Sequence, residues 1–290
     1  MSGVELGQIV VNALMLSGIL ALVALGFSLV WGIMNIVNLA HGPFIVLGAY
    51  ITFWLHELWG IDPFLTIPVA MLVLFVLGFV IQRVLINQVI RAPLLATFLL
   101  TFGLEILIVN LINYFFKADL RSVTTAYSGT GFSLGLVRVP YIRLAALGFS
   151  LVLVYALWWF LNNTRPGNAI RATGMDIEAA QLTGVKVATI YALTFAIGAA
   201  LAGAAGSLLG MAIPFDPNLG GSYTQRAFVI CVLGGLGNVL NVVIGAIVFA
   251  FADVFVGARI PQLSQAITFG ILVLLLVLRP HGIAGKAFYS

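Results

Sequence analysis

Two carboxylic acids lie inside long apolar stretches of this 290-residue chain. Glu105 occurs in TFGLEILIVN and Asp253 in VFAFADVFVG. A charge in hydrocarbon is expensive, so such residues usually face a cavity or a partner. Both are candidates for a transport pathway, with two alternatives: Glu105 is protonated or bonded to a neighbouring helix, and Asp253 reaches water at a span end. Arg226, which opens an apolar run, is interpreted as a residue that snorkels to the interface.

A polar interruption, NIVNLAHGP, offers a second kind of chemistry. Asn35, Asn38 and His41 are three residues apart, so a helix would line them on one face. Gly42 and Pro43 suit the start of a new helix. A helix that begins inside the membrane points N–H groups into the bundle, where they can bind a carboxylate. The alternative is a cytoplasmic turn that polar side chains cap and that substrate does not contact.

A second break, GGLGN (234–238), contains Gly234 and Gly235. It indicates a pathway, a hinge or a close helix crossing. Enzymatic chemistry finds no support, because there is no nucleophile–base motif, phosphate loop or dinucleotide fingerprint. The histidines His41, His56 and His281 are too dispersed for a metal motif, and Cys231 is the only cysteine, so we expect no metal site.

Composition fixes the class of protein that must position these residues. Hydrophobic residues make up 62% of the chain and charged residues 8%, and the mean hydropathy is +1.17. A soluble domain carries about 25% charged residues. The chain is therefore predicted to be an integral membrane protein. Its net charge of +4 suits loops that set membrane orientation, and we expect no nucleic-acid partner.

The fold predicted is all-α, a polytopic bundle of transmembrane helices, because no alternating barrel pattern appears. One domain covers residues 1–290, with about eight or nine membrane segments that include short or broken helices. Apolar stretches lie near 8–31, 43–59, 63–86, 93–116, 140–161 and 188–211, and 224–278 has room for three short crossings. Basic residues divide five against four between the two sides. That weak difference places the loop 162–187 and the tail in the cytoplasm.

The stretch 191–211 carries small residues at helical spacing. Gly198, Ala202, Gly206 and Gly210 form one line, and Ala199, Gly203 and Ser207 form a second beside it. Helices in lipid associate through close backbone contact, so this span should pack tightly in the bundle. A subunit interface or a moving gate helix is the alternative use.

The loop 162–187 carries the signals of a short helix. Asp176 is a good N-cap, alone or with Thr173 in a capping box, and Glu178 favours a helix N-terminus. Gly184 suits the position after the last turn. A helix of about two turns is not stable alone in water, so it must pack on its own protein or on a partner.

The faces of this helix indicate what it packs on. Met175, Ala179 and Leu182 would share one face, and Ala179 and Ala180 would let a partner backbone come close. These features favour a docking element, with a plain capped surface helix as the alternative.

This segment, EAAQLTG, resembles the Glu-Ala-Ala-x-x-x-Gly loop of the permease subunits of ATP-binding-cassette importers, through Glu178, Ala179, Ala180 and Gly184. In that family the loop forms a cytoplasmic coupling helix that docks in a groove on the ATPase. Four stretches together resemble the branched-chain amino-acid permeases, closest to the smaller of their two types. They are GFSLVWGIMNIVNLAHGPFIVLGAY (26–50), TRPGNAIRATGMDIEAAQLTGV (164–185), VLGGLGNVLNVVIGAI (232–247) and VLLLVLRPHGIAG (273–285).

The resemblance implies the rest of the machine. It implies a heterodimer with a related permease, two cytoplasmic ATPases that use ATP and Mg²⁺, and a periplasmic solute-binding protein. This chain would bind no cofactor, be no enzyme, and lie in the bacterial inner (plasma) membrane as a multi-pass protein. Its cargo would be branched-chain amino acids, with urea, amides or other small solutes as the alternative. The competing class is an ion-coupled transporter or channel that uses Glu105 or Asp253.

Overall fold

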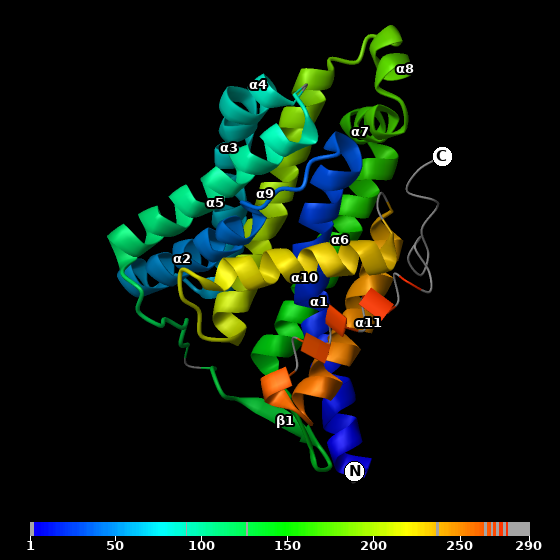
Figure 1. Ribbon diagram of the computed structural model, residues 1–290. Coiled ribbons are helices and arrows are strands. Elements are labelled where there is room, and N and C mark those ends of the chain that lie inside the picture. Colours follow the sequence, from blue (N-terminus) through cyan, green and yellow to red (C-terminus); the bar gives the residue numbers. More distant parts are fainter. Residues whose placement is uncertain are drawn as a thin grey trace.

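The computed structural model describes residues 3–277, except for 91, 126, 236–237, 264–265, 268, 271–272 and 275–276. Helices dominate it, as the all-α prediction required (Figure 1). Six helical runs in this part of the chain are long and apolar enough to cross a membrane. They are α1 (Gly3–Met34), the run from α3 to α4 (Pro63–Val89), α5 (Leu94–Phe116), α6 (Tyr141–Asn163), α9 (Val187–Ala212) and α11 (Val239–Gly257).

Two further helices complete the bundle, which gives eight segments in the described chain. They are α2 (His41–Trp59) and α10 (Leu219–Gly234). The polytopic bundle with short helices is therefore confirmed. Residues 264–278, predicted to hold the end of a last crossing, lie partly outside the described residues, as does most of the motif at 273–285.

Helix α9 forms the centre of the molecule. Its small residues let three neighbours approach: Gly198 meets Gly26 of α1, Gly206 meets the Ile45 carbonyl of α2, and Ala199 meets Gly78 of α3. The tight packing predicted for this span is confirmed. Because α9 is mostly enclosed by its own chain, its stripes serve the bundle itself.

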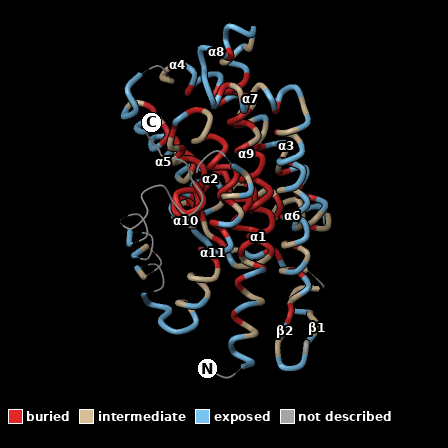
Figure 2. The backbone as a smooth tube through the Cα atoms, turned by 90° about the vertical axis from the view of Figure 1, so that its right-hand side faces the viewer, coloured by how far each residue is buried: buried red, intermediate tan, exposed pale blue. Residues whose placement is uncertain are grey.

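The outer helices are apolar but poorly buried. Only 28% of the most apolar stretch is buried in α3, α5 and α11, and only 22% in α6, whereas the value is 83% in α1. Figure 2 shows the buried residues gathered around α1, α2 and α9, with exposed residues on the outside. Such surfaces suit lipid or another membrane chain.

The run that contains α3 (Pro63–Ile81) changes its winding before it ends. Residues Gln82–Ile86 form a π-helical turn, η1, and Asn87–Val89 continue as the short α4. π-Turns insert an extra residue into the helix and occur often at functional sites. Both Gln82 side-chain polar atoms are buried and make no hydrogen bond to the described chain.

The chain between α1 and α2 leaves the helix. Asn35 adopts a left-handed backbone with φ 53°, and residues 35–40 are not helical before α2 starts at His41. The prediction that Asn35, Asn38 and His41 share one helix face is therefore wrong. Asparagine tolerates the left-handed conformation that ends helices, and here it ends α1.

A β-hairpin that the sequence analysis missed lies beside the N-terminus. Strand β1 (Gly131–Leu134) pairs antiparallel with β2 (Val137–Pro140), with Gly131 opposite Pro140. The hairpin occupies the end of the bundle opposite α7 (Arg165–Met175) and α8 (Ile177–Leu182) (Figure 1). The molecule therefore presents two different polar ends.

Candidate functional site

The loop 162–187 folds into two short helices, each with its own N-cap. The Thr164 hydroxyl accepts a hydrogen bond from the Gly167 amide at 3.1 Å and starts α7. The Asp176 carboxylate accepts from the Ala179 amide at 3.0 Å and starts α8. Asp176 is thus the cap, as predicted. The capping-box partner proposed for it is wrong, since Thr173 is buried inside α7 and its hydroxyl donates to the Ala169 carbonyl at 2.8 Å.

The far end of α8 is closed by a glycine. Gly184 has φ 87°, and its amide donates to the Gln181 carbonyl at 2.9 Å. The Val185 amide donates to the Ala180 carbonyl at 3.1 Å. These two bonds form a Schellman motif, so the predicted role of Gly184 is confirmed. Caps at both ends hold a six-residue helix that could not persist alone.

The two alanines of α8 have opposite surroundings. Ala180 is 3% exposed, whereas Ala179 and Leu182 are exposed, Leu182 to 89%. Met175, predicted to share their helix face, is instead the last residue of α7 and precedes the N-cap Asp176, so that part of the prediction is wrong. A partner surface was predicted under both alanines, and that is wrong for Ala180. Adjacent helical residues do not share a face, and the Ala180 face is covered by its own chain. The carboxylates of Asp176 and Glu178 lie on the exposed part.

The start of α2 is a closed packing site. The Asn38 side chain accepts from the Ala40 amide at 3.1 Å, the His41 amide donates to the Asn38 carbonyl at 3.3 Å, and the Gly42 amide donates to the Thr224 hydroxyl at 2.9 Å. The His41 ring lies 2.8 Å from the Val23 carbonyl oxygen. These donors already have acceptors, so the predicted carboxylate site formed by free N–H groups is wrong.

Glycines bring α10 close to α2 and to α11, two of the helices that it packs against. A side chain on Gly42 would collide with the backbone of Gly220, so α2 and α10 touch there. Gly234 packs on the backbone of α11 near Gly245, and Gly235, with φ 87°, ends α10. Of the three uses open for GGLGN, the structure shows a close crossing, while residues 236–237 lie outside the described part.

The two intramembrane acids have different surroundings. The Asp253 carboxylate lies 3.2 Å from the guanidinium of Arg226, whose Cζ atom lies 5.2 Å from the centre of the Tyr223 ring. Arg226 therefore joins α10 to α11, and its interpretation as a snorkelling residue is wrong. Asp253 has Arg226 as a cationic partner within its own bundle. The alternative in which its carboxylate is stabilised by reaching water at a span end is therefore not needed.

Glu105 instead faces a cavity of about 440 Å³ between α5, the 35–40 segment and α10. Its lining is mostly apolar, with polar groups from α10: Leu39, Phe98, Leu99, Phe102, Glu105, Gly221, Thr224 and Gln225. A second cavity, of about 360 Å³, shares Phe98 and is lined by Val37, Leu94, Leu95, Thr97 and Phe98. The predicted orientation of Glu105 towards a cavity is therefore observed.

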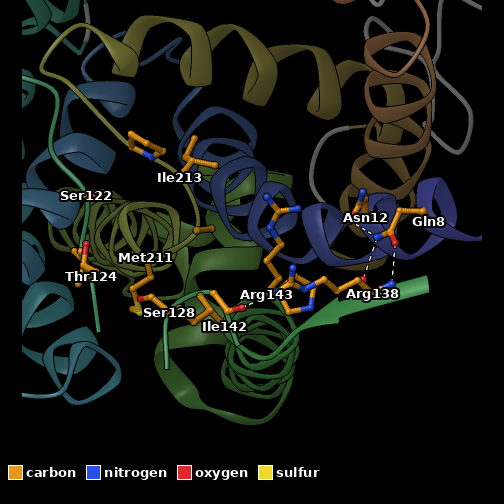
Figure 3. A pocket seen from close by; sticks show the side chains of 15 residues that line it. Gln8, Asn12, Ser122, Thr124, Ser128, Arg138, Ile142, Arg143, Met211 and Ile213 are labelled. Atoms are coloured by element: carbon orange, nitrogen blue, oxygen red, sulfur yellow. Dashed lines mark hydrogen bonds between the residues drawn. The ribbon is translucent and has the colours of Figure 1, made fainter. Parts of the chain in front are cut away.

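A larger cavity, about 660 Å³, opens at the hairpin end (Figure 3). The side-chain amide of Gln8 in α1 makes two hydrogen bonds to the backbone of Arg138. Its Nε2 atom donates to the Arg138 carbonyl at 3.0 Å, and its Oε1 atom accepts from the Arg138 backbone N–H at 2.9 Å, which ties the hairpin to α1. Asn12 and Arg143 also line the cavity. Sequence reasoning missed this site, although Gln8 and Asn12 are polar residues one helical turn apart in the first span.

Metal chemistry finds no support in the described residues. They contain no group of three or more His, Cys, Asp or Glu side chains that could hold an ion. His281 lies outside the described part of the chain. The thiol of Cys231 is buried and lies 3.3 Å from the Ala24 carbonyl, in keeping with a packing role.

Six helices long and apolar enough to cross a membrane, cavities beside α5 and a loop helix capped at both ends define a polytopic helical membrane protein. The comparison with known proteins is more specific. Residues 9–276 match the family described as branched-chain amino acid transport system / permease component, and the chain belongs to that family. It is a multi-pass protein of the bacterial inner (plasma) membrane.

The relatives cover almost the whole chain. It is 30% identical to the high-affinity branched-chain amino acid transport system permease protein BraD of Pseudomonas aeruginosa, over 96% of this chain and 95% of that protein. It is 27% identical to the high-affinity branched-chain amino acid transport system permease protein LivH of Escherichia coli K12, over 95% of this chain and 94% of that protein. The galactose/methyl galactoside import permease protein MglC of Salmonella typhimurium is 31% identical over 72% of this chain and 66% of its own. No solved structure matches the chain.

Proposed function

We propose that this chain is the permease subunit of an ATP-driven importer and moves branched-chain amino acids across the inner membrane by alternating access. The observation that carries the coupling half of the proposal is the exposed apolar face of α8. Leu182 presents it at 89% exposure on a helix that Asp176 and Gly184 hold in place, and Met175, the last residue of α7, adds apolar surface at 85% exposure. The cargo follows from the printed function of BraD and LivH.

The position of α8 suits a mechanical link. Ala180 anchors it to the bundle, and α9 begins at Val187, a few residues after the Schellman motif. Because α9 packs against α1, α2 and α3, a displacement of α8 reaches the helices around the core. An ATPase that closes on ATP would push on Ala179 and its exposed neighbours and switch the cavities between outward and inward access.

The remaining surfaces suit the other partners. The exposed apolar faces of α5 and α6 suit a second permease, which makes a heterodimer the proposed arrangement. The hairpin end, with Arg138 and Arg143 at its cavity, suits a periplasmic solute-binding protein (Figure 3). ATP and Mg²⁺ would be used by the ATPase chains, and this chain would bind no cofactor.

The test is co-expression with the neighbouring genes, followed by uptake in proteoliposomes. We expect an ATPase to co-purify and leucine uptake to require ATP and to survive an ionophore. Uptake that survives ATP depletion and collapses with an ionophore would instead support an ion-coupled transporter. Binding measurements on the cognate solute-binding protein separate branched-chain amino acids from urea and short amides, the alternative cargo.

A further inference from the structure

We propose that the cavity beside Glu105 holds the amino-acid substrate in transit, with the Glu105 carboxylate receiving its ammonium group. This inference rests on the proposed function, because it identifies the residues that would recognise an amino-acid cargo. It extends that function by giving a binding role to a residue that the coupling mechanism does not use.

The first step is the position of Glu105. It lies near the middle of α5 (Leu94–Phe116), half-buried, where a carboxylate exposed to lipid would be very costly. Asp253 has Arg226 as an ionic partner, but Glu105 makes no ion pair with any other described residue. A cationic ligand in the cavity that Glu105 faces would supply the compensating charge that the described chain does not provide.

The second step is the lining around it. Phe98, Leu99 and Phe102 cover one wall of the same cavity, so an ammonium group at Glu105 would leave an attached apolar side chain against aromatic and aliphatic carbon. Ligand sites of this design combine a mostly apolar lining with a few placed polar groups. The charge and the lining together match an amino acid with a branched hydrocarbon side chain.

The third step is the opposite wall, which α10 supplies. A Cβ added to Gly221 would lie in ordinary van der Waals contact with Glu105, 3.6 Å from its Oε1 atom, so the absence of a side chain at Gly221 leaves space beside the carboxylate. The Thr224 hydroxyl already accepts from the Gly42 amide at 2.9 Å. Gln225 is exposed at the cavity, and its side-chain amide can donate to the substrate carboxylate.

The fourth step is the direction of the path. The second cavity continues from Phe98 to Leu94 and Leu95, at the start of α5. That end of α5 follows α4 and lies toward the α7–α8 end of the bundle (Figure 1). The two cavities therefore follow one face of α5 from Glu105 toward the proposed cytoplasmic side.

The first experiment measures leucine uptake by the complete reconstituted importer. Glu105→Gln keeps the shape of the side chain and removes its charge, so we expect uptake to fall at least about tenfold while the complex assembles normally. Glu57→Gln makes the same chemical change at an exposed site at the end of α2 and should leave uptake unchanged. Wild-type uptake in an assembled Glu105→Gln complex would overturn the proposal.

The second experiment leaves Glu105 intact and reports occupancy directly. Leu99→Cys introduces a reactive thiol on the apolar wall of the cavity, where Leu99 is 57% exposed, while the native Cys231 is buried and should not react. L-Leucine should slow maleimide labelling of this thiol, whereas the corresponding 2-oxo acid, which lacks the ammonium group, should not. Equal protection by both compounds, or by neither, would contradict the role of Glu105.

The outcomes separate this inference from the proposed function. If the wild type imports leucine with ATP but leucine gives no protection and Glu105→Gln transports normally, the cavity instead belongs to an interface with another chain and the importer proposal stands. If the wild type does not import amino acids, the cargo assignment fails and this inference fails with it.

Discussion

Arg226 of α10 and Asp253 of α11 form an ion pair with 3.2 Å between guanidinium nitrogen and carboxylate oxygen. Their side chains are only 19% and 11% exposed. Two charges at this depth compensate each other, and the pair fixes the crossing of α10 on α11 that Gly234 and Gly245 make possible. Asp253 therefore serves the packing of the bundle, in contrast to Glu105, which faces a cavity.

We predict that Asp253→Asn destabilises the protein by about 3–5 kcal/mol, because it leaves the Arg226 charge buried without compensation. Combining Arg226→Met with Asp253→Leu should restore most of the stability and keep transport. Thermal unfolding of the purified protein and uptake assays measure both effects. Asp119→Asn is the control, since Asp119 is 67% exposed and 3.9 Å from Arg121. Loss of transport in the stable double variant would indicate that Asp253 acts as a coupling site.

The second prediction compares two adjacent alanines of α8. Ala179→Trp places bulk on the exposed face, so it should abolish the coupling of ATP hydrolysis to uptake without lowering the unfolding temperature. Ala180→Trp places the same bulk in a buried site and should destabilise by about 1–3 kcal/mol or more. Thermal unfolding compares the stability of the two variants, and uptake and ATPase-stimulation assays compare their coupling. Normal uptake and stimulation in Ala179→Trp would contradict the docking role.

The third prediction concerns pH at the hairpin end. The Tyr127 hydroxyl donates to the Asp62 carboxylate at 2.8 Å, and burial together with that carboxylate raises the pKa of Tyr127 from 10.0 to about 12. A raised folded-state pKa stabilises the fold below pH 10.0 and loses that contribution as the pH rises toward 12. Unfolding temperatures measured across this range should fall more steeply in the wild type than in Tyr127→Phe. Parallel curves for the two proteins would contradict the assignment.

Local signals were enough to predict the ends of α8 and the role of α9. An N-cap carboxylate and a C′ glycine act within one helical turn, so Asp176 and Gly184 could be assigned from neighbouring residues alone. The small-residue lines of α9 needed only helical spacing. In each case the stabilising interaction or the packing face is already encoded in a short stretch of chain.

Distant pairings could not be predicted in this way. The acceptor for the Gly42 amide is Thr224, 182 residues further along the chain, and it turns a predicted open helix start into a closed one. The same limitation affected Arg226, whose partner lies on the following helix. Helix phase also depends on tertiary packing: the sequence placed Ala179 and Ala180 together, and only the bundle determines which of them is covered.

The last prediction tests the centre of the bundle. Gly206 of α9 lies directly against the Ile45 carbonyl of α2, so Gly206→Ala must push the two backbones apart and should cost about 1–3 kcal/mol or more. Gly103→Ala is the matched control in α5, because its added methyl group meets nothing within 4 Å. There the better helix propensity of alanine should stabilise by about 0.5–1 kcal/mol. Thermal unfolding of the two variants measures both shifts, which should have opposite signs. Equal shifts would mean that the α2–α9 contact is looser than the structure shows. Since α9 carries the proposed link from α8 to the core, a fall in uptake by Gly206→Ala larger than its loss of folded protein would also show that this contact transmits the coupling motion.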